Sequence, residues 1–133
     1  MIAYLIVDVD DLLQRLDSRG VTLDIHTVAA ALINSAVLAA GLQAKEDLSA
    51  VAVADWNRYR RPSGSAGVSV QQVFASEGYD LFNVPDRSVV ADALLKHYFS
   101  IETDQIDELI VASTRNDIVS LVPRVDISSR TRV

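Results

Sequence analysis

Two short apolar runs, each followed by an aspartate, constrain the fold of this chain most strongly. Residues 2–7 (IAYLIV) stop at Asp8, and residues 48–54 (LSAVAVA) stop at Asp55. Runs of this length suit strands, and their nearly continuous apolar character indicates strands that are buried on both faces, as in a parallel sheet. The sequence therefore predicts an α/β protein whose sheet is covered by helices on both sides.

The remaining pattern alternates helices with strands. Two further strands are predicted over 80–84 and 108–112. Helices are predicted over 12–20, from a cap at Asp24 or Thr27 to Gly41, over 68–76, over 87–99 and from about 117 to Pro123. We expect one domain over residues 1–124, which forms a three-layer sandwich with a mainly parallel central sheet of four or five strands. The tail over 125–133 is expected to form a short edge strand or a loose terminus.

Composition narrows the chemistry that is open to the chain. With no cysteine, disulfides, thiolate zinc sites and thiol nucleophiles are excluded, and the two histidines, His26 and His97, have no partner at metal-ligand spacing. Eighteen acidic and twelve basic residues give a net charge of −6, which argues against non-specific coating of DNA. Any metal must therefore bind carboxylates, which favours Mg²⁺ or Mn²⁺.

Aspartates follow three of the four predicted strands at or near their carboxyl ends. Asp8 and Asp10 follow the first, Asp55 the second and Asp117 the fourth. Parallel strands deliver these ends to one edge of the sheet, which is where open α/β sheets bind ligands. Clustered carboxylates repel one another, so a divalent cation that bridges to a substrate phosphate is one solution. The other is that each aspartate caps the helix after its strand.

Several motifs resemble those of the NYN and PIN-like ribonucleases. Residues 4–13 (YLIVDVDDLL) are similar to the family's first motif, an apolar strand that ends in Asp. Residues 78–95 (GYDLFNVPDRSVVADALL) are similar to its third strand and the helix after it, with a basic residue before Ala-Asp. Residues 110–122 (IVASTRNDIVSLV) take the place of its Ser-Gly-Asp-x-Asp-Phe motif. The resemblance runs from about residue 2 to 122.

The resemblance implies a PIN-like, Rossmann-related fold and a metal-dependent RNA endonuclease with an acidic site at the carboxyl edge. Position by position, it makes Asp8, Asp92 and Asp117 the catalytic and metal-binding carboxylates, matches Ser113 to the motif serine and implies Mg²⁺ or Mn²⁺ as cofactor. Beside these, we expect Asp10 as a further metal ligand that partly compensates for a missing carboxylate. We expect Ser113, Arg87 and Arg115 to contact the RNA.

The chain departs from the family pattern at three positions. Asp11 stands where the family has Asn, Thr114 replaces the motif glycine, and Arg115 replaces the first motif aspartate. A guanidinium among metal ligands either weakens a second metal or binds the scissile phosphate itself. A catalytically degenerate domain that binds RNA or serves in assembly is therefore the first alternative function.

An arginine-rich segment follows the second strand. Arg58, Arg60 and Arg61 alternate with Trp56 and Tyr59. Arginines contact phosphates and aromatic faces stack on unpaired bases, so the segment suits single-stranded or structured RNA. Alternatively, Trp56 seals the edge of the sheet and the arginines are simply solvated.

A second alternative is a phosphotransferase of the haloacid dehalogenase type. The residues Val7-Asp8-Val9-Asp10 satisfy its Asp-x-Asp motif, with Asp8 as nucleophile and Asp10 as acid. The mechanism also needs a lysine and a late acidic pair after a strand. Lys96 is predicted in mid-helix and the next strand ends in Ser113-Thr114, so this alternative is the weaker one.

Location and assembly can be predicted only coarsely. No stretch reaches the roughly 20 apolar residues that span a bilayer, so no membrane segment is predicted. The N-terminus lacks the pattern of a signal peptide, so the cytoplasm is expected. The alanine-rich helix predicted up to Gly41 permits close approach to the sheet or to a second subunit, which makes a homodimer plausible.

Overall fold

The computed structural model describes residues 3–20, 24–59, 69–97, 106–113 and 127–132. These residues form an α/β fold with one five-stranded sheet. Its strands are β1 (Ala3–Asp8), β2 (Leu48–Ala54), β3 (Asp80–Asn83), β4 (Ile106–Ala112) and β5 (Ile127–Arg132). The α-helices are α1 (Val9–Ser18), α2 (Ile25–Ala40), α3 (Val70–Ser76) and α4 (Val90–His97), and the short 3-10 helices are η1 (Lys45–Asp47), η2 (Trp56–Tyr59) and η3 (Arg87–Val89).

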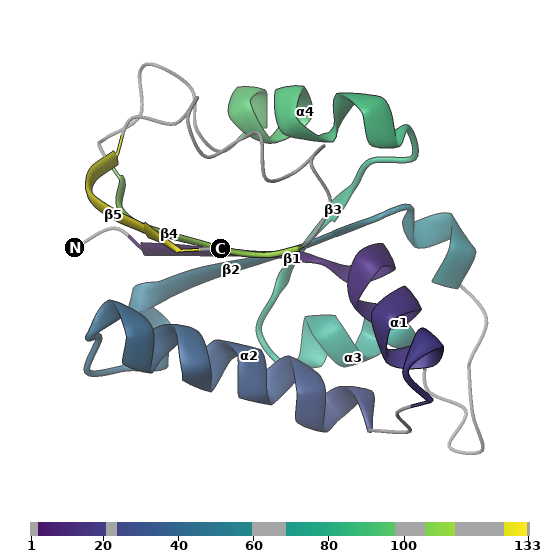
Figure 1. The fold of residues 1–133 in the computed structure, drawn as a ribbon, viewed down its shortest axis with the longest axis horizontal. Coiled ribbons are helices and arrows are strands. Elements are labelled where there is room, and N and C mark those ends of the chain that lie inside the picture. The colour runs from purple at the N-terminus through teal and green to yellow at the C-terminus, as the bar shows by residue number, and fades with distance from the viewer. Residues whose placement is uncertain (1–2, 21–23, 60–68, 98–105, 114–126, 133) are drawn as a thin grey trace.

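Every strand pairing is parallel, and the strand order is β3-β2-β1-β4-β5. From β1 the chain adds β2 and β3 on one side, and then crosses to add β4 and β5 on the other. Helices α1, α2 and α3 cover one face of the sheet and α4 covers the opposite face (Figure 1). Right-handed crossovers require this change of face when the direction of strand addition reverses. The predicted three-layer α/β architecture is therefore confirmed.

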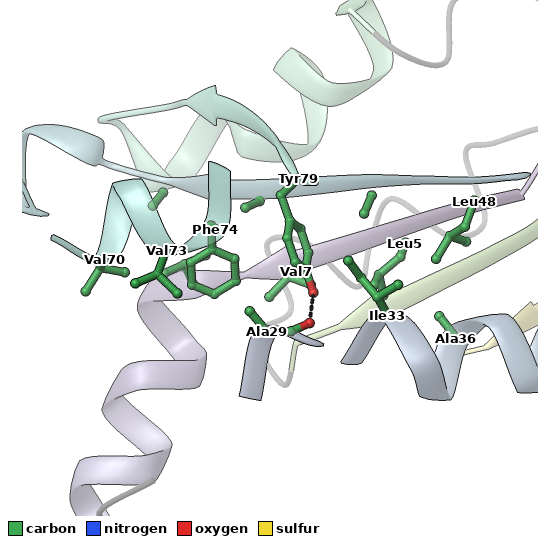
Figure 2. Packing of buried hydrophobic residues seen from close by; sticks show 14 of the residues in the cluster. Leu5, Val7, Ala29, Ile33, Ala36, Leu48, Val70, Val73, Phe74 and Tyr79 are labelled. Carbon is green, nitrogen blue, oxygen red and sulfur yellow. Dashed lines mark hydrogen bonds between the residues drawn. The ribbon is translucent and has the colours of Figure 1, made fainter. Parts of the chain in front are cut away.

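The central strand β1 is buried on both faces, as its continuous apolar sequence predicts. Leu5 and Val7 belong to the larger cluster, beneath α1, α2 and α3, whereas Ile6 belongs to the smaller cluster beneath α4. Figure 2 shows the larger cluster, in which Phe74 of α3 and Ile33 of α2 pack toward the strands. Alternate residues of one strand thus join the two helical layers to the same sheet.

Local capping explains where the helices begin and end. Asp24 begins α2, because its side chain accepts a hydrogen bond from the His26 backbone N–H at 3.3 Å. Gly41 ends α2 in the left-handed conformation, with φ of 69°. Ser69 and Gln72 form a reciprocal capping box at the start of α3. These residues fix the helix ends that carry chain from one strand to the next.

Tyr79, the residue directly before β3, connects the start of that strand to α2. Its ring lies edge-on to Phe74, and its hydroxyl donates to the Ala29 carbonyl at 2.8 Å (Figure 2). Burial raises the pKa of the Tyr79 hydroxyl above its ordinary value, and the nearby Glu77 carboxylate raises it further. The phenol therefore stays protonated in the folded protein at a pH at which it ionises in the unfolded chain.

This difference predicts a loss of stability at alkaline pH. Above about pH 10 the unfolded chain releases the Tyr79 proton while the folded chain retains it, so the free energy of unfolding falls by up to about 1.4 kcal/mol per pH unit. Tyr79→Phe removes this contribution. Urea unfolding between about pH 8 and 11 should show the stability advantage of the wild type over Tyr79→Phe narrowing above pH 10. A constant difference over that range would contradict the assignment.

Most described elements agree with those predicted from sequence, but α1 begins at Val9, three residues before its predicted start, because Asp8 caps it, and the predicted helix from residue 87 begins as the 3-10 helix η3. The predicted strand over 48–54 has the observed bounds of β2. The tail over 125–133, predicted as a short edge strand or a loose terminus, contains β5, which pairs with β4 at one edge of the sheet. The predicted last helix, up to Pro123, lies outside the described residues. Among the helices that the structure describes, none is long and apolar enough to cross a membrane.

Candidate functional site

The carboxyl ends of β1 and β4 form the centre of the candidate site. Asp8 is the last residue of β1 and Ser113 directly follows β4. The Ser113 hydroxyl donates to Asp8 Oδ2 at 2.9 Å. These two strands lie where the direction of strand addition reverses, which is the place where open α/β sheets form a ligand-binding crevice. Asp8 and Ser113 were both predicted as site residues, and the fold brings them into contact.

Asp8 also begins α1. Its Oδ1 accepts a hydrogen bond from the Asp11 backbone N–H at 3.3 Å, which is the geometry of a helix N-cap. The side chain is buried, with 0% relative exposure. The functional and capping interpretations of Asp8 are therefore not alternatives, because one carboxylate holds both the helix start and the contact to β4.

Asp10 connects the start of α1 to the segment after β2. Its Oδ1 accepts a hydrogen bond from the Tyr59 hydroxyl of η2. Its Oδ2 accepts from the Asp55 backbone N–H at 3.4 Å, and the Arg58 guanidinium lies 3.9 Å from Oδ1. The Asp10 side chain is only 4% exposed, whereas that of Arg58 is 65% exposed. Asp10 is thus a buried acceptor with one largely solvated cation beside it.

Tyr59 is the donor that matches this buried carboxylate. Its partial burial raises the pKa of the phenol above its ordinary value, and the hydrogen bond to Asp10 and the charge of Asp10 raise it further. The hydroxyl therefore remains a proton donor toward Asp10 throughout the neutral range. This contact fixes the orientation of the carboxylate, as outer hydrogen-bond partners do for metal ligands.

Trp56 does not present its ring for base stacking. The residue is 5% exposed, and its indole N–H donates to the Phe82 carbonyl at 3.1 Å. Its backbone N–H donates to Asn83 Oδ1 at 2.9 Å. The interpretation in which Trp56 seals the edge of the sheet is the one that the structure supports, because its ring is already packed in the core and its polar atoms are bonded to β3.

Asp55 adds a buried carboxylate oxygen to this edge. Asp55 follows β2 directly, and its Oδ1 is buried without a hydrogen-bond partner within the described part of the chain. A buried acceptor without a donor costs free energy, so such an atom calls for an explanation. Its backbone N–H already bonds Asp10, which places Asp55 in the same network.

The other predicted residues are placed less completely. Asp92 lies in the first turn of α4, on the face of the sheet opposite α1, and is exposed. Arg87 is the first residue of η3. Four predicted residues lie outside the described residues: Asp117, Arg115, Arg60 and Arg61. Within the described ranges, no three acidic or histidine side chains form a group that could hold a metal ion.

A separate pocket lies away from the carboxyl edge. It has a volume of about 380 Å³ and is lined in part by Ile33 and by Leu48, the first residue of β2. None of its lining residues is a predicted site residue. The candidate site is therefore identified by the convergence of hydrogen-bonded polar side chains and not by this pocket.

Sequence reasoning missed the roles of Tyr59 and Asp55 as partners of Asp10. Tyr59 was expected to stack on bases, and no motif indicated its bond to Asp10. A usable signal does exist, because β1 and β2 are parallel neighbours and both residues follow the carboxyl end of β2.

Comparison of the chain with protein-family models, with curated proteins and with solved structures found no match.

Proposed function

We propose that this protein is a metal-dependent RNA endonuclease of the NYN/PIN-like type, with its site over the carboxyl ends of β1 and β4. The observation that carries the proposal is the hydrogen bond between Ser113 and Asp8 across these two strands. It joins the two ends of the motif resemblance, more than a hundred residues apart, at the ligand-binding edge of the sheet.

The donor set fits a hard divalent cation. Asp8 and Asp10 supply carboxylate oxygens near the start of α1, and the orphaned Oδ1 of Asp55 lies in the network of Asp10. Mg²⁺ and Mn²⁺ take such ligands, and Mg²⁺ commonly uses only one or two carboxylates together with waters and substrate phosphates.

Each side chain has a distinct task in this proposal. Asp8 and Asp10 would hold the ion, while Ser113 and Tyr59 would keep the two carboxylates oriented. When bound, the ion would activate the attacking water and stabilise the leaving oxygen of a phosphodiester. Arg58 would contact the RNA backbone, since its guanidinium is exposed beside the site.

A specific observation favours a second candidate, an RNA-binding domain without catalysis. Asp10 accepts hydrogen bonds at both of its oxygens, and Asp8 does so as well. Carboxylates that are bonded in this way can share an edge without a cation, because the donors offset their mutual repulsion. With Arg115 in place of a motif aspartate, the domain would retain the RNA surface and lose the reaction.

Cleavage of a labelled single-stranded RNA decides between the two candidates. We expect the wild type to cut it with Mg²⁺ or Mn²⁺ and not with EDTA, and we expect Asp8→Asn to abolish cleavage. Asp47→Asn is the matched control, because it removes one exposed carboxylate of η1, before the amino end of β2. RNA binding without cleavage under every metal condition would establish the second candidate, and absence of both would refute the proposal.

RNA affinity should depend on the arginine-rich segment. Replacing Arg58, Arg60 and Arg61 by alanine should weaken binding and reduce the salt slope of the affinity by about 2, since each phosphate contact to a single strand contributes about 0.7. The control variant replaces Arg15, Arg19 and Lys45 and thus removes the same charge elsewhere. Equal effects of the two triple variants would show that only net charge matters.

A further inference from the structure

Helix α2 presents an outer face that carries no charge. The helix contains no Asp, Glu, Lys or Arg in its 16 residues, whereas the shorter α1 contains four. It is the outermost element of its layer (Figure 1). The exposed positions recur at helical spacing and form what we call the outer face of α2: Thr27, Ala31, Asn34, Ser35 and Leu38.

Leu38 gives this face a protruding apolar group. Its relative exposure is 82%, the larger of two values for exposed large hydrophobic residues within the described chain; the other is 43%, for Val89. About two turns toward the N-terminus, at Ala31, the same face has only a methyl group. The outer face therefore combines a protruding side chain at Leu38 with a shallow position at Ala31.

We propose that the outer face of α2 is a homodimer interface in which two α2 helices pack antiparallel about a two-fold axis between Asn34 and Ser35. This arrangement places Leu38 of each copy over Ala31 of the partner subunit, because both residues lie equally far from the axis along the helix. An isologous contact needs such self-complementarity. Small residues along the rest of the face permit the 8–10 Å approach of packed helices.

Electrostatics select a second copy, and the antiparallel direction, for this face. Two chains that each carry a net charge of −6 repel one another least where uncharged surfaces meet, and the outer face is uncharged along its length. Antiparallel packing also sets the positive N-terminal end of one helix dipole beside the negative C-terminal end of the other. Parallel packing would bring the two exposed Asp24 side chains together.

The size of the face predicts a dimer that dissociates on dilution. A 16-residue helix is about 24 Å long. A single helix pair of this length lies near the lower limit of specific interfaces, about 1,000 Å² in total. The proposal does not depend on the function proposed above, since no residue of the outer face of α2 belongs to the candidate site.

Because the chain has no cysteine, single cysteines can test the arrangement directly. Ser35→Cys would lie beside the axis, within reach of the same residue in the other copy. Thr27→Cys lies on the same face, but its two copies would be about 22 Å apart along the helices, beyond the roughly 7 Å that a disulfide can bridge. Mild oxidation should therefore link Ser35→Cys into a dimer at least ten times faster than Thr27→Cys. Equal rates, or no link in either variant, would overturn the proposal.

Sedimentation velocity over roughly a hundredfold range of concentration gives an independent readout. We expect the wild type to shift from monomer to dimer and Leu38→Glu to weaken dimerisation at least tenfold. Val89→Glu is the matched control, because it places the same charge on the other exposed hydrophobic residue, in η3. A wild type that stays monomeric throughout, or equal effects of the two variants, would contradict the interface. Circular dichroism should show both variants folded.

Discussion

Replacing Asp8 by alanine is expected to lower the free energy of unfolding by about 2–3 kcal/mol in the presence of EDTA. Loss of the cap at the Asp11 N–H accounts for about 1 kcal/mol, and loss of the acceptor for the Ser113 hydroxyl accounts for the rest. Asp8→Asn should cost about 1 kcal/mol or less, because its amide can accept from Asp11 and donate to Ser113.

This pair of variants separates the structural role of Asp8 from its proposed chemistry. Urea unfolding measures the first and RNA cleavage the second, and only Asp8→Asn should remain stable while losing cleavage. The hydrogen bonds to Asp8 are the reason for the expected loss in alanine, so an alanine variant as stable as the wild type in EDTA would contradict the capping role.

The bond between Tyr59 and Asp10 is expected to be the strongest single contact between η2 and α1. Tyr59→Phe should destabilise the wild type by about 2 kcal/mol, because the buried, charged carboxylate of Asp10 then loses the hydrogen bond from the phenol. In an Asp10→Ala background the same change should cost almost nothing. A double-mutant cycle in urea measures this coupling.

Arg58 provides the matched contrast at the same carboxylate. Its guanidinium lies 3.9 Å from Asp10 and is 65% exposed, so Arg58→Ala should cost less than about 1 kcal/mol in stability. A Tyr59–Asp10 coupling no larger than that of Arg58 with Asp10 would show that the phenol does not anchor η2. Loss of RNA affinity in Arg58→Ala with little loss of stability would support its role on the substrate.

Most of the fold could be predicted because local signals agree with one another. The apolar run of β1, the Asp24 cap and Gly41 stop of α2, and the bounds of β2 are each readable from neighbouring residues. The order of the strands was not predicted, because the right-handed crossover rule fixes the hand of each connection and not which strands become neighbours. The bounds of β4 were predicted less well. Glu108 was expected to begin this strand, but the strand begins two residues earlier and Glu108 is buried within it, with 1% exposure.

The site was harder to predict because its contacts join residues that are distant in sequence. The Ser113–Asp8 pair could be anticipated from two motifs, since parallel strands bring their carboxyl ends together. The Tyr59–Asp10 pair had only a weaker signal, because both residues follow the carboxyl ends of neighbouring parallel strands but no motif indicated that their side chains would bond. Sequence alone favoured a different role for Tyr59 and Trp56, that of rings that stack on RNA bases. The burial of Trp56 excludes this role for the indole ring.

Binding of Mn²⁺, followed by electron paramagnetic resonance as the free ion is depleted, tests the central claim most directly. The wild type should bind Mn²⁺ in the absence of RNA, Asp8→Asn should weaken that binding at least tenfold, and Asp47→Asn should leave it unchanged. Asparagine removes the charge of a ligand while keeping its shape, so the comparison isolates the carboxylate. Equal Mn²⁺ affinity in the wild type and Asp8→Asn, or no binding by the wild type, would contradict a metal site at the carboxyl ends of β1 and β4.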